Sequence, residues 1–291
     1  MAFETTTTSA NDYVLAAELL ASRILPFFYG HNNVSHLTRY ESIAGSPTTA
    51  ADFPTAGQVV AANMPEGTDT PYSQFSTGKV TLTVSTVGVV LGITDLLDKS
   101  QIVDMGHYAE QAGFGLANKI TTDVLALNAG FSQVAGSTGV DLTEANILTA
   151  IQLLGAGGVP GPYNGVIHNI QWFDLAGSVG STLNTANAPG NATVAQTTRD
   201  FGAEPAFSGG LNNLYGVNWT VNSNVPTMAA GADRAGVVVN PMYASGFVSK
   251  WDARVEFQRD ASALVTEIVV TACYAVGELR DAAGVLIQTD A

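Results

Sequence analysis

Alternating apolar residues mark the clearest strand in the first third of the chain. The apolar positions are Val80, Leu82, Val84, Val87, Val89 and Leu91, and the positions between the first three hold threonine. A period of two is typical of a strand with one buried face. We therefore expect a strand that begins near Val80 and stops at Gly92.

A helical period follows this strand. Apolar residues recur every three or four positions, at Ile102, Met105, Ala109, Ala112, Leu116, Ile120, Val124 and Leu127. This spacing predicts a helix about 40 Å long, capped by Asp98 or Ser100 and ending before Gly130. Three glycines lie inside it, and each costs about 1 kcal/mol relative to alanine. We therefore expect a bend, or another backbone that approaches closely, near Gly106, Gly113 and Gly115.

The second half of the chain alternates shorter elements. Asp141 followed by Glu144 predicts a capping box for a helix that ends at the glycines of 155–161. We then expect a strand at Tyr163–Asn169 and a helix from Gln171 to about Val179. Further strands are expected at Leu214–Val221, Ala235–Asn240, Val255–Phe257, Leu264–Val276 and Val285–Thr289.

Three segments follow neither period. The first 11 residues predict a flexible arm, followed by a short helix from Tyr13 to about Ile24. Gly45–Gly78 contains four of the chain's eleven prolines. Since a long loop inside a compact domain is rare, we expect a projecting hairpin that lies on a neighbour. Residues 181–210, rich in Asn, Thr and Gly, predict an irregular loop.

Composition changes this picture in one respect. The chain has 291 residues, enough for a large core, but only 12% of them are charged. That is half of the usual share of about 25%. A surface with so few charges suggests that other copies of the chain cover much of it. The 25 acidic and 11 basic residues give a net charge of −14, which disfavours nucleic acid as a specific ligand.

Several classes of protein are excluded by composition. The single cysteine, Cys273, excludes an intramolecular disulfide and a cysteine-based zinc cluster. The N-terminal segment does not resemble a secretory signal, and the apolar run at Tyr13–Tyr29 is too short to span a bilayer. We therefore expect a soluble protein that is not associated with a membrane.

The candidate residues for catalysis do not form a recognisable site. His168 has Asp174 nearby in sequence, but a G-x-S-x-G motif is absent, so a structural role at a strand end is favoured over a hydrolase. The glycines of 155–161 have the wrong spacing for a dinucleotide loop. The acidic pairs Asp12/Glu18 and Asp95/Asp98 and the histidines His31, His36 and His107 lack further ligands in reach. We expect no enzyme activity, no cofactor and no metal.

Three stretches together resemble a known family. They are DLLDKSQIVDMGHYAEQAGFGLANKITTDVLALNAG at 95–130, LTEANILTAIQLLGAGGVPGPYNGVIHNIQWFDL at 142–175, and EFQRDASALVTEIVVTACYAVGELRDAAGVLIQTD at 256–290. Their order, after an arm and a Pro-rich loop, is similar to the major capsid proteins of tailed bacteriophages, which have the HK97-like fold. The resemblance implies an α+β protein.

The resemblance also implies a domain organisation. Residues 1–43 would form an N-terminal arm, and residues 44–86 an extended E-loop hairpin over the neighbouring subunit. The P-domain would comprise 87–140, with a long spine helix, and the C-terminal β segment 248–291. The A-domain, a central α/β region, would comprise 141–247.

The function implied is a structural virion protein that self-assembles into an icosahedral shell around double-stranded DNA. The partners would be other copies in pentamers and hexamers, a portal protein, a separate scaffolding protein and a decoration protein, with DNA as non-specific cargo. Assembly would take place in the cytoplasm of the host bacterium. We expect subunit contacts at Phe53, Val59, Val60, Tyr72, Phe75, Lys79, Tyr13 and Leu19. Lys79, the lysine of the loop region, lies at its base, so we do not expect crosslinking through it.

Two other classes stay open from the sequence. An encapsulin-like nanocompartment has the same fold with a protein cargo. A phage tail or surface-layer protein would explain the Gly, Thr and Asn content, although such chains usually show repeated strands, and we find no internal repeat.

Overall fold

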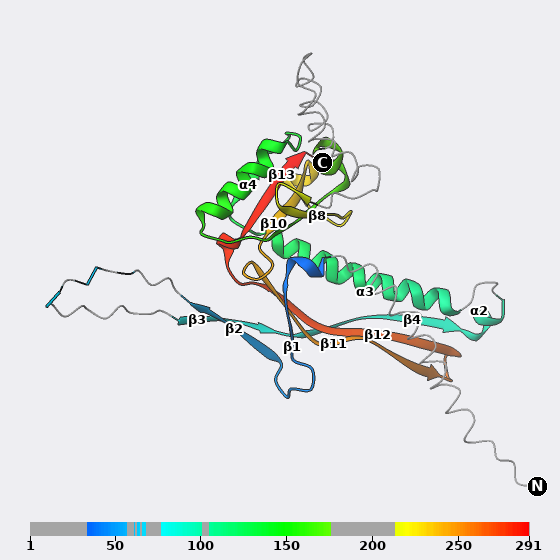
Figure 1. Ribbon diagram of the computed structural model, residues 1–291. Coiled ribbons are helices and arrows are strands. Elements are labelled where there is room, and N and C mark those ends of the chain that lie inside the picture. The colour runs from blue at the N-terminus through cyan, green and yellow to red at the C-terminus, as the bar shows by residue number, and fades with distance from the viewer. Residues whose placement is uncertain are drawn as a thin grey trace, which may run out of the picture.

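The computed structural model describes residues 34–56, 61, 63–64, 66–67, 77–100, 105–175 and 213–290. These residues form two separate sheets, joined by a long helix, and a two-stranded hairpin (Figure 1). The predicted arm, the helix at 13–24 and the loop at 181–210 lie outside the described residues.

The first sheet is made of strands from both ends of the chain. Its order is β1 (Arg39–Ser42), β11 (Ser245–Asp260), β12 (Val265–Glu278) and β4 (Ser85–Thr94). β11 and β12 form a long antiparallel hairpin, and β12 pairs antiparallel with all of β4. The C-terminal strands predicted on either side of 260–263 are therefore confirmed.

One face of this sheet is covered by helix α3 (Met105–Asn128), which follows the short helix α2 (Asp95–Ser100). Apolar side chains of α3 pack on alternate residues of β4 and β12. The buried residues of this core are Ala112, Leu116, Ala117 and Ile120 from α3, Ile93 from β4, and Ile268, Val270, Ala272 and Tyr274 from β12. The long helix predicted from its period is confirmed. A Cβ added at Gly115 would reach Val89 at 4.0 Å, so this glycine lies where the helix approaches the sheet.

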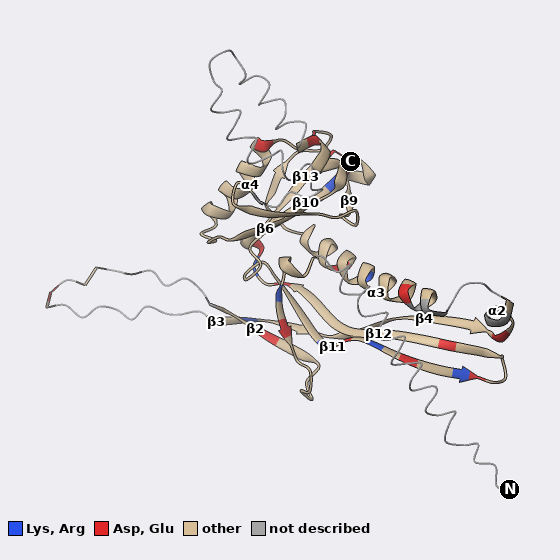
Figure 2. Ribbon diagram, turned by 45° about the vertical axis from the view of Figure 1, so that its right-hand side comes forward, with Lys and Arg blue, Asp and Glu red and all other residues tan. Residues whose placement is uncertain are grey.

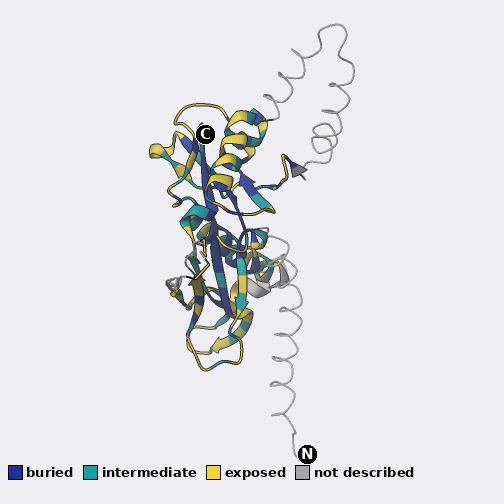
Figure 3. Ribbon diagram, turned by 60° about the vertical axis from the view of Figure 1, so that its left-hand side comes forward, coloured by how far each residue is buried: buried dark blue, intermediate teal, exposed yellow. Residues whose placement is uncertain are grey.

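The second sheet has seven strands. The order is β5 (Val134–Gly136), β13 (Gly284–Asp290), β10 (Asp233–Val239), β6 (Tyr163–Ile167), β8 (Val217–Val221) and β7 (Asn213–Leu214), and β9 (Thr227–Met228) also pairs with β10. Helix α4 (Glu144–Ala156) packs on one face through Ile147, Ala150 and Leu154. The other face meets the end of α3 and the short helix η1 (Ser35–Leu37). Because both faces are covered, the central strands are buried (Figure 3).

A buried glutamine holds the helical residues 169–175 against this sheet. The Gln171 side chain donates to the Arg234 carbonyl at 3.1 Å and to Thr289 Oγ1 at 2.7 Å. Its Oε1 accepts the His168 amide at 3.0 Å. The helix predicted from Gln171 is thus present as far as residue 175, and the rest of it lies outside the described residues.

The predicted hairpin is present at its base. β2 (Ala50–Ala56) and β3 (Thr77–Thr83) pair antiparallel from Ala50↔Thr83 to Ala56↔Thr77. The hairpin extends away from the end of the first sheet (Figure 1). The strand predicted to run from Val80 to Gly92 is therefore divided, because the chain leaves β3 at Val84 and joins a different sheet as β4.

Two further predictions are wrong. We grouped the last strand with the C-terminal β segment of the first sheet, but β13 pairs with β10 and β5 of the second sheet. The short helix η3 (Asp281–Ala283) separates β12 from β13, so the chain changes sheets there. The predicted capping box at Asp141 is also absent, since the N-cap of α4 is Thr143 and its side chain makes no capping hydrogen bond.

Candidate subunit-contact surfaces

The base of the β2–β3 hairpin packs against two glycines of the first sheet. Gly246 of β11 and Gly277 of β12 lie directly opposite each other. A Cβ added at Gly246 would meet Phe53 Cζ at 3.2 Å, and one added at Gly277 would overlap Leu82 Cδ2. Without these Cβ atoms the hairpin approaches the sheet closely, and Phe53, Leu82, Ala51 and Val248 form a small core. This contact fixes the direction in which the hairpin leaves the sheet.

A charged pair lies on the exposed part of the same hairpin. Lys79 Nζ contacts Asp52 Oδ2 at 2.7 Å, with side chains 66% and 49% exposed. Thr81 also donates to Asp52. The hydrogen bonds from Lys79 and Thr81 hold the pKa of Asp52 below its usual value. Lys79 therefore presents an ammonium group that is already engaged within its own hairpin.

The expected contact residues have different outcomes. Phe53 is only 1% exposed and belongs to the core of its own chain, and its role as a subunit contact stays a prediction. Lys79 is exposed on the hairpin, and its contact role stays a prediction. The other expected contacts lie outside the described residues, namely Tyr13, Leu19, Val59, Val60, Tyr72 and Phe75.

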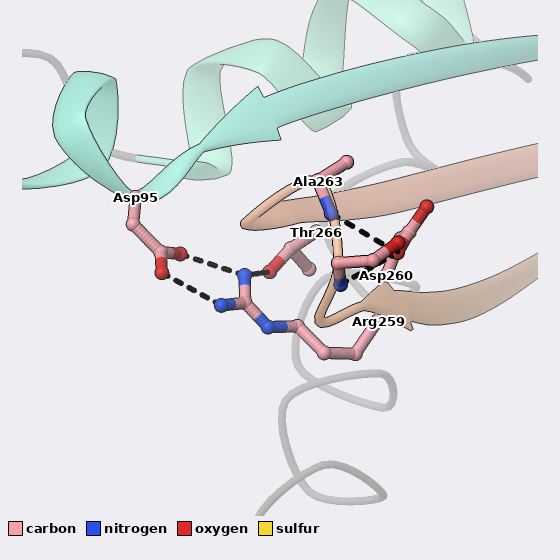
Figure 4. A network of polar contacts seen from close by, with 6 residues as sticks. Asp95, Arg259, Asp260, Ala263 and Thr266 are labelled. Atoms are coloured by element: carbon pink, nitrogen blue, oxygen red, sulfur yellow. Dashed lines mark hydrogen bonds and ion pairs between the residues drawn. The ribbon is translucent and has the colours of Figure 1, made fainter.

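A polar network closes the far end of the first sheet (Figure 4). Both guanidinium nitrogens of Arg259 donate to the carboxylate oxygens of Asp95, each at 2.6 Å. Nη1 also donates to Thr266 Oγ1 at 3.2 Å. Asp95 follows directly after β4, and Arg259 lies on β11. The bidentate pair therefore connects these two strands across β12. Asp95 thus begins helix α2 and serves as the ion-pair partner of Arg259.

The turn beside this network is closed by a carboxylate. Asp260 Oδ1 accepts the amides of Ser262 at 2.9 Å and Ala263 at 3.2 Å, and the Ser262 hydroxyl at 2.7 Å. These hydrogen bonds, led by the Ser262 hydroxyl, lower the pKa of Asp260. The carboxylate replaces the backbone partners that a tight turn lacks.

A cleft of about 370 Å³ opens between α3, η1 and the first sheet. Three stacked rings form one wall, with Tyr40–Phe247 centroids at 6.0 Å and Phe247–Tyr274 centroids at 5.5 Å. The Tyr274 hydroxyl donates to Asp123 at 2.7 Å, and burial raises the pKa of Tyr274 strongly. At the mouth, Tyr40 is 58% exposed and Trp251 37% exposed. The arrangement presents aromatic contact area at the surface, and the Tyr274 hydroxyl within it is hydrogen-bonded to Asp123.

His168 and His36 contact other groups of their own chain, whereas His107 is exposed on α3. His168 is 9% exposed, and its Nδ1 accepts the Ile170 amide at 3.2 Å at the start of the helical residues 169–175. Burial, with a smaller effect of Arg234, lowers the pKa of His168, so the ring is neutral. His36 Nε2 contacts Thr220 Oγ1 at 3.0 Å. No group of three His, Cys, Asp or Glu side chains among the described residues could hold a metal ion.

The glycines at 155–161 end a helix through their backbone conformation. Gly157 is the C-cap of α4, and Gly158 has φ +66°, the left-handed conformation that commonly ends a helix. The predicted helix terminus at the glycines of 155–161 is therefore confirmed. In the described part of the chain, Lys and Arg are spread along the hairpin, the helix α3, the first sheet and β10 (Figure 2). None of the helices described there is long and apolar enough to cross a membrane.

The fold was compared with solved structures. A structure of Mycobacterium phage Che8 matches with a TM-score of 0.63 at 18% identity, covering 81% of this chain and 84% of that chain. The capsid of Ralstonia phage GP4 matches with a TM-score of 0.65 at 11% identity, covering 88% and 87%. The chain has the HK97-like capsid fold. The predicted α+β class is confirmed with it.

The matching structures also include one that is described as a virus-like particle. A virus-like particle from Pyrococcus furiosus matches with a TM-score of 0.61 at 10% identity, covering 94% of this chain and 99% of that chain. Neither a family model nor a curated protein matches the sequence. The shared fold is therefore visible in the arrangement of elements and only weakly in the residues.

Two features of the surfaces were missed from the sequence. Gly246 and Gly277 each interrupt a strongly β-patterned segment, and a glycine inside a strand often marks close approach of another backbone or side chain. That signal was available. Which segment approaches them is not encoded locally, because Phe53 and Leu82 lie more than a hundred residues away along the chain.

Proposed function

We propose that the protein is a major capsid protein that self-assembles into an icosahedral shell enclosing double-stranded DNA. The observation that carries this proposal is the HK97-like fold over most of the chain, with phage capsids among the matches. The low charge content and the projecting hairpin support it, since both favour a subunit covered by its neighbours. The role is structural, and we propose no enzyme activity.

The proposed domains follow the elements of the structure. The hairpin β2–β3 belongs to the E-loop, and α3 is the spine helix of the P-domain with the first sheet. The A-domain contains α4 and the second sheet, which extends the predicted region 141–247 by β5 and β13. The proposed N-terminal arm of residues 1–43 ends in η1, which packs on the second sheet, and in β1, which pairs with β11 of the first sheet.

The proposed partners are other copies of the chain in pentamers and hexamers, a portal protein, a separate scaffolding protein and a decoration protein. Assembly takes place in the cytoplasm of the host bacterium, and the product is the virion. An acidic subunit suits a shell that holds DNA without binding it tightly, because duplex DNA carries about one negative charge per 1.7 Å.

Electron microscopy of the purified protein, with and without a co-expressed scaffold, tests this function. We expect closed particles hundreds of ångströms across. A compact monomer under every condition, as judged by light scattering and microscopy, contradicts the proposal.

A nanocompartment shell is the second candidate. The match to the virus-like particle from Pyrococcus furiosus, which covers 94% of this chain and 99% of that chain, keeps this candidate open. The content of native particles decides between the two. DNA inside them supports the phage capsid, and an enclosed protein supports the nanocompartment.

A further inference from the structure

Strand β4 forms one edge of the first sheet. It pairs with β12 along Ser85–Thr94, and no other described strand lies on its outer side. Its sequence, STVGVVLGIT, has ten residues, no charge and no proline. A long uncharged edge presents a row of backbone donors and acceptors that another strand can pair with.

The other sheet edges in the described part of the chain are protected against such pairing. β1 has four residues and carries Arg39 and Glu41, while β5 has three residues and β7 has two. In the hairpin, β2 carries Asp52 and Pro54, and β3 carries Lys79. Shortness, charge and proline are the usual devices that prevent edge-to-edge association. Only β4 lacks all three among these edges.

The surroundings of β4 make it a rigid and flat template. Val87, Val89 and Leu91 pack against the core below α3, which holds the strand in place. On the opposite face, Gly88 and Gly92 flank Val90, which is 61% exposed. Because the two glycines carry no side chain, Val90 is the one bulky β4 residue on that face between Gly88 and Gly92.

We propose that the outer edge of β4, over Ser85–Ile93, pairs with an extended segment of a second copy of this chain and continues the first sheet across a subunit boundary. The inference rests on the proposed shell function, in which copies lie side by side. A subunit with net charge −14 repels its copies, so contacts form best where charge is absent. β4 is the longest such edge in the described residues.

Hydrogen exchange of the wild-type protein tests the proposal directly. Peptides covering Ser85–Ile93 are compared between free subunits and purified particles by mass spectrometry. We expect exchange of the outward amides to slow by at least about tenfold on assembly, because an added strand gives them partners. Peptides from β10, which pairs on both sides within the subunit, are the internal control and keep the same rate.

A matched pair of variants tests the contact independently. Val90→Lys places a charge in the middle of the edge, and Val134→Lys places the same charge on β5, where Val134 is 43% exposed. We expect Val90→Lys to reduce particle yield by at least about tenfold and Val134→Lys to leave it within about twofold. Circular dichroism of both variants controls for folding.

Each outcome decides one proposal. Particles whose β4 amides exchange as fast as in the free subunit overturn the edge pairing, as does slow exchange already present in the free subunit. Equal particle yields for the two lysine variants overturn it as well. If the wild-type protein forms no particles at all, the shell function itself fails, which is a distinguishable result.

Discussion

Gly277 shows how a single missing side chain shapes the surface of this molecule. A Cβ at this position would overlap Leu82 Cδ2, whereas one at Gly246 would only touch its neighbours at 3.2–3.3 Å. The two glycines therefore have different tolerances although they lie opposite each other. The closest approach of the hairpin to the sheet is therefore at Gly277.

We predict that Gly277→Ala destabilises the protein by about 1–3 kcal/mol, the usual cost of forcing an extra methyl group into a packed site. Urea unfolding measures the change. Gly155→Ala is the control, because a Cβ there has open space and the residue lies in helix α4. That substitution is expected to stabilise by up to about 1 kcal/mol. A neutral Gly277→Ala would show that Leu82 can move away without loss.

Two carboxylates of the second sheet are expected to respond to pH in opposite directions. Burial, with the charges of Asp141 and Asp290, raises the pKa of Asp174 above its usual 3.8. Its contribution to stability is therefore present below pH 3.8 and is lost as the pH rises through the folded-state pKa. Asp233 accepts hydrogen bonds from Gln288 and the Gly139 amide, which lower its pKa. Its contribution is present above pH 3.8 and is lost as the pH falls.

We therefore predict that Asp174→Asn raises the melting temperature at pH 7 by a few degrees, while Asp233→Asn lowers it. The Asp174 difference is expected to shrink near pH 3, where the parent carboxylate is protonated, whereas the Asp233 difference shrinks only as the pH falls through its lowered pKa. Thermal unfolding of the three proteins at the two pH values measures this. The same sign for both variants at pH 7 would contradict the assignment.

At the scale of elements, local patterns predicted the helices and most strands, but not their partners. The period of three to four residues gave α3 almost to its ends, since it depends only on neighbours along the chain. The sequence prediction placed β13 in the wrong sheet. Its pairing with β10 joins residues about fifty positions apart, and such a pairing leaves no local pattern in the sequence. One signal was overlooked: the inward positions are even-numbered through Val84 and odd-numbered from Val87. That change of phase marks where the chain leaves the hairpin for the first sheet.

The Arg259–Asp95 pair connects β11 with the start of α2, which lie far apart in the sequence. We predict that loss of its two parallel hydrogen bonds affects mainly the nearby turn. Arg259→Lys keeps the charge but cannot donate two parallel hydrogen bonds to Asp95. Because both side chains are partly exposed, at 31% and 41%, the free energy of unfolding should fall by less than about 1 kcal/mol. Exchange of the turn amides near Ser262 is expected to become faster.

The control for this prediction lies on the same strand. Arg254 contacts Glu256 at 2.7 Å within β11, so Arg254→Lys disturbs a pair that connects no second element. Its turn amides are expected to exchange at the parental rate. Equal acceleration in both variants would mean that the turn responds to strand β11 in general and not to the contact with Asp95.

At the scale of the whole molecule, the fold separates two tasks. The second sheet is covered by helices on both faces, whereas the hairpin, the aromatic cleft and the outer edge of β4 are open among the described residues. Composition indicated this division early, because 12% charge is too little to solvate so extended a surface. The sequence alone does not separate buried apolar residues from exposed ones. Phe53, for example, lies in the hairpin segment and yet belongs to the core of its own chain.

The net charge of −14 leads to a prediction about assembly, which rests on the proposed shell function. Raising the ionic strength from about 0.01 M to 0.15 M shortens the Debye length from about 30 Å to about 8 Å. Repulsion between neighbouring acidic subunits then weakens, while apolar contacts are hardly affected. We expect the subunit concentration needed for particle formation to fall severalfold, as measured by light scattering. Sucrose at the same osmolality is the control, because it is excluded from the protein surface but does not screen charge. If the concentration needed for particle formation rises with salt, attraction between opposite charges dominates the subunit contacts.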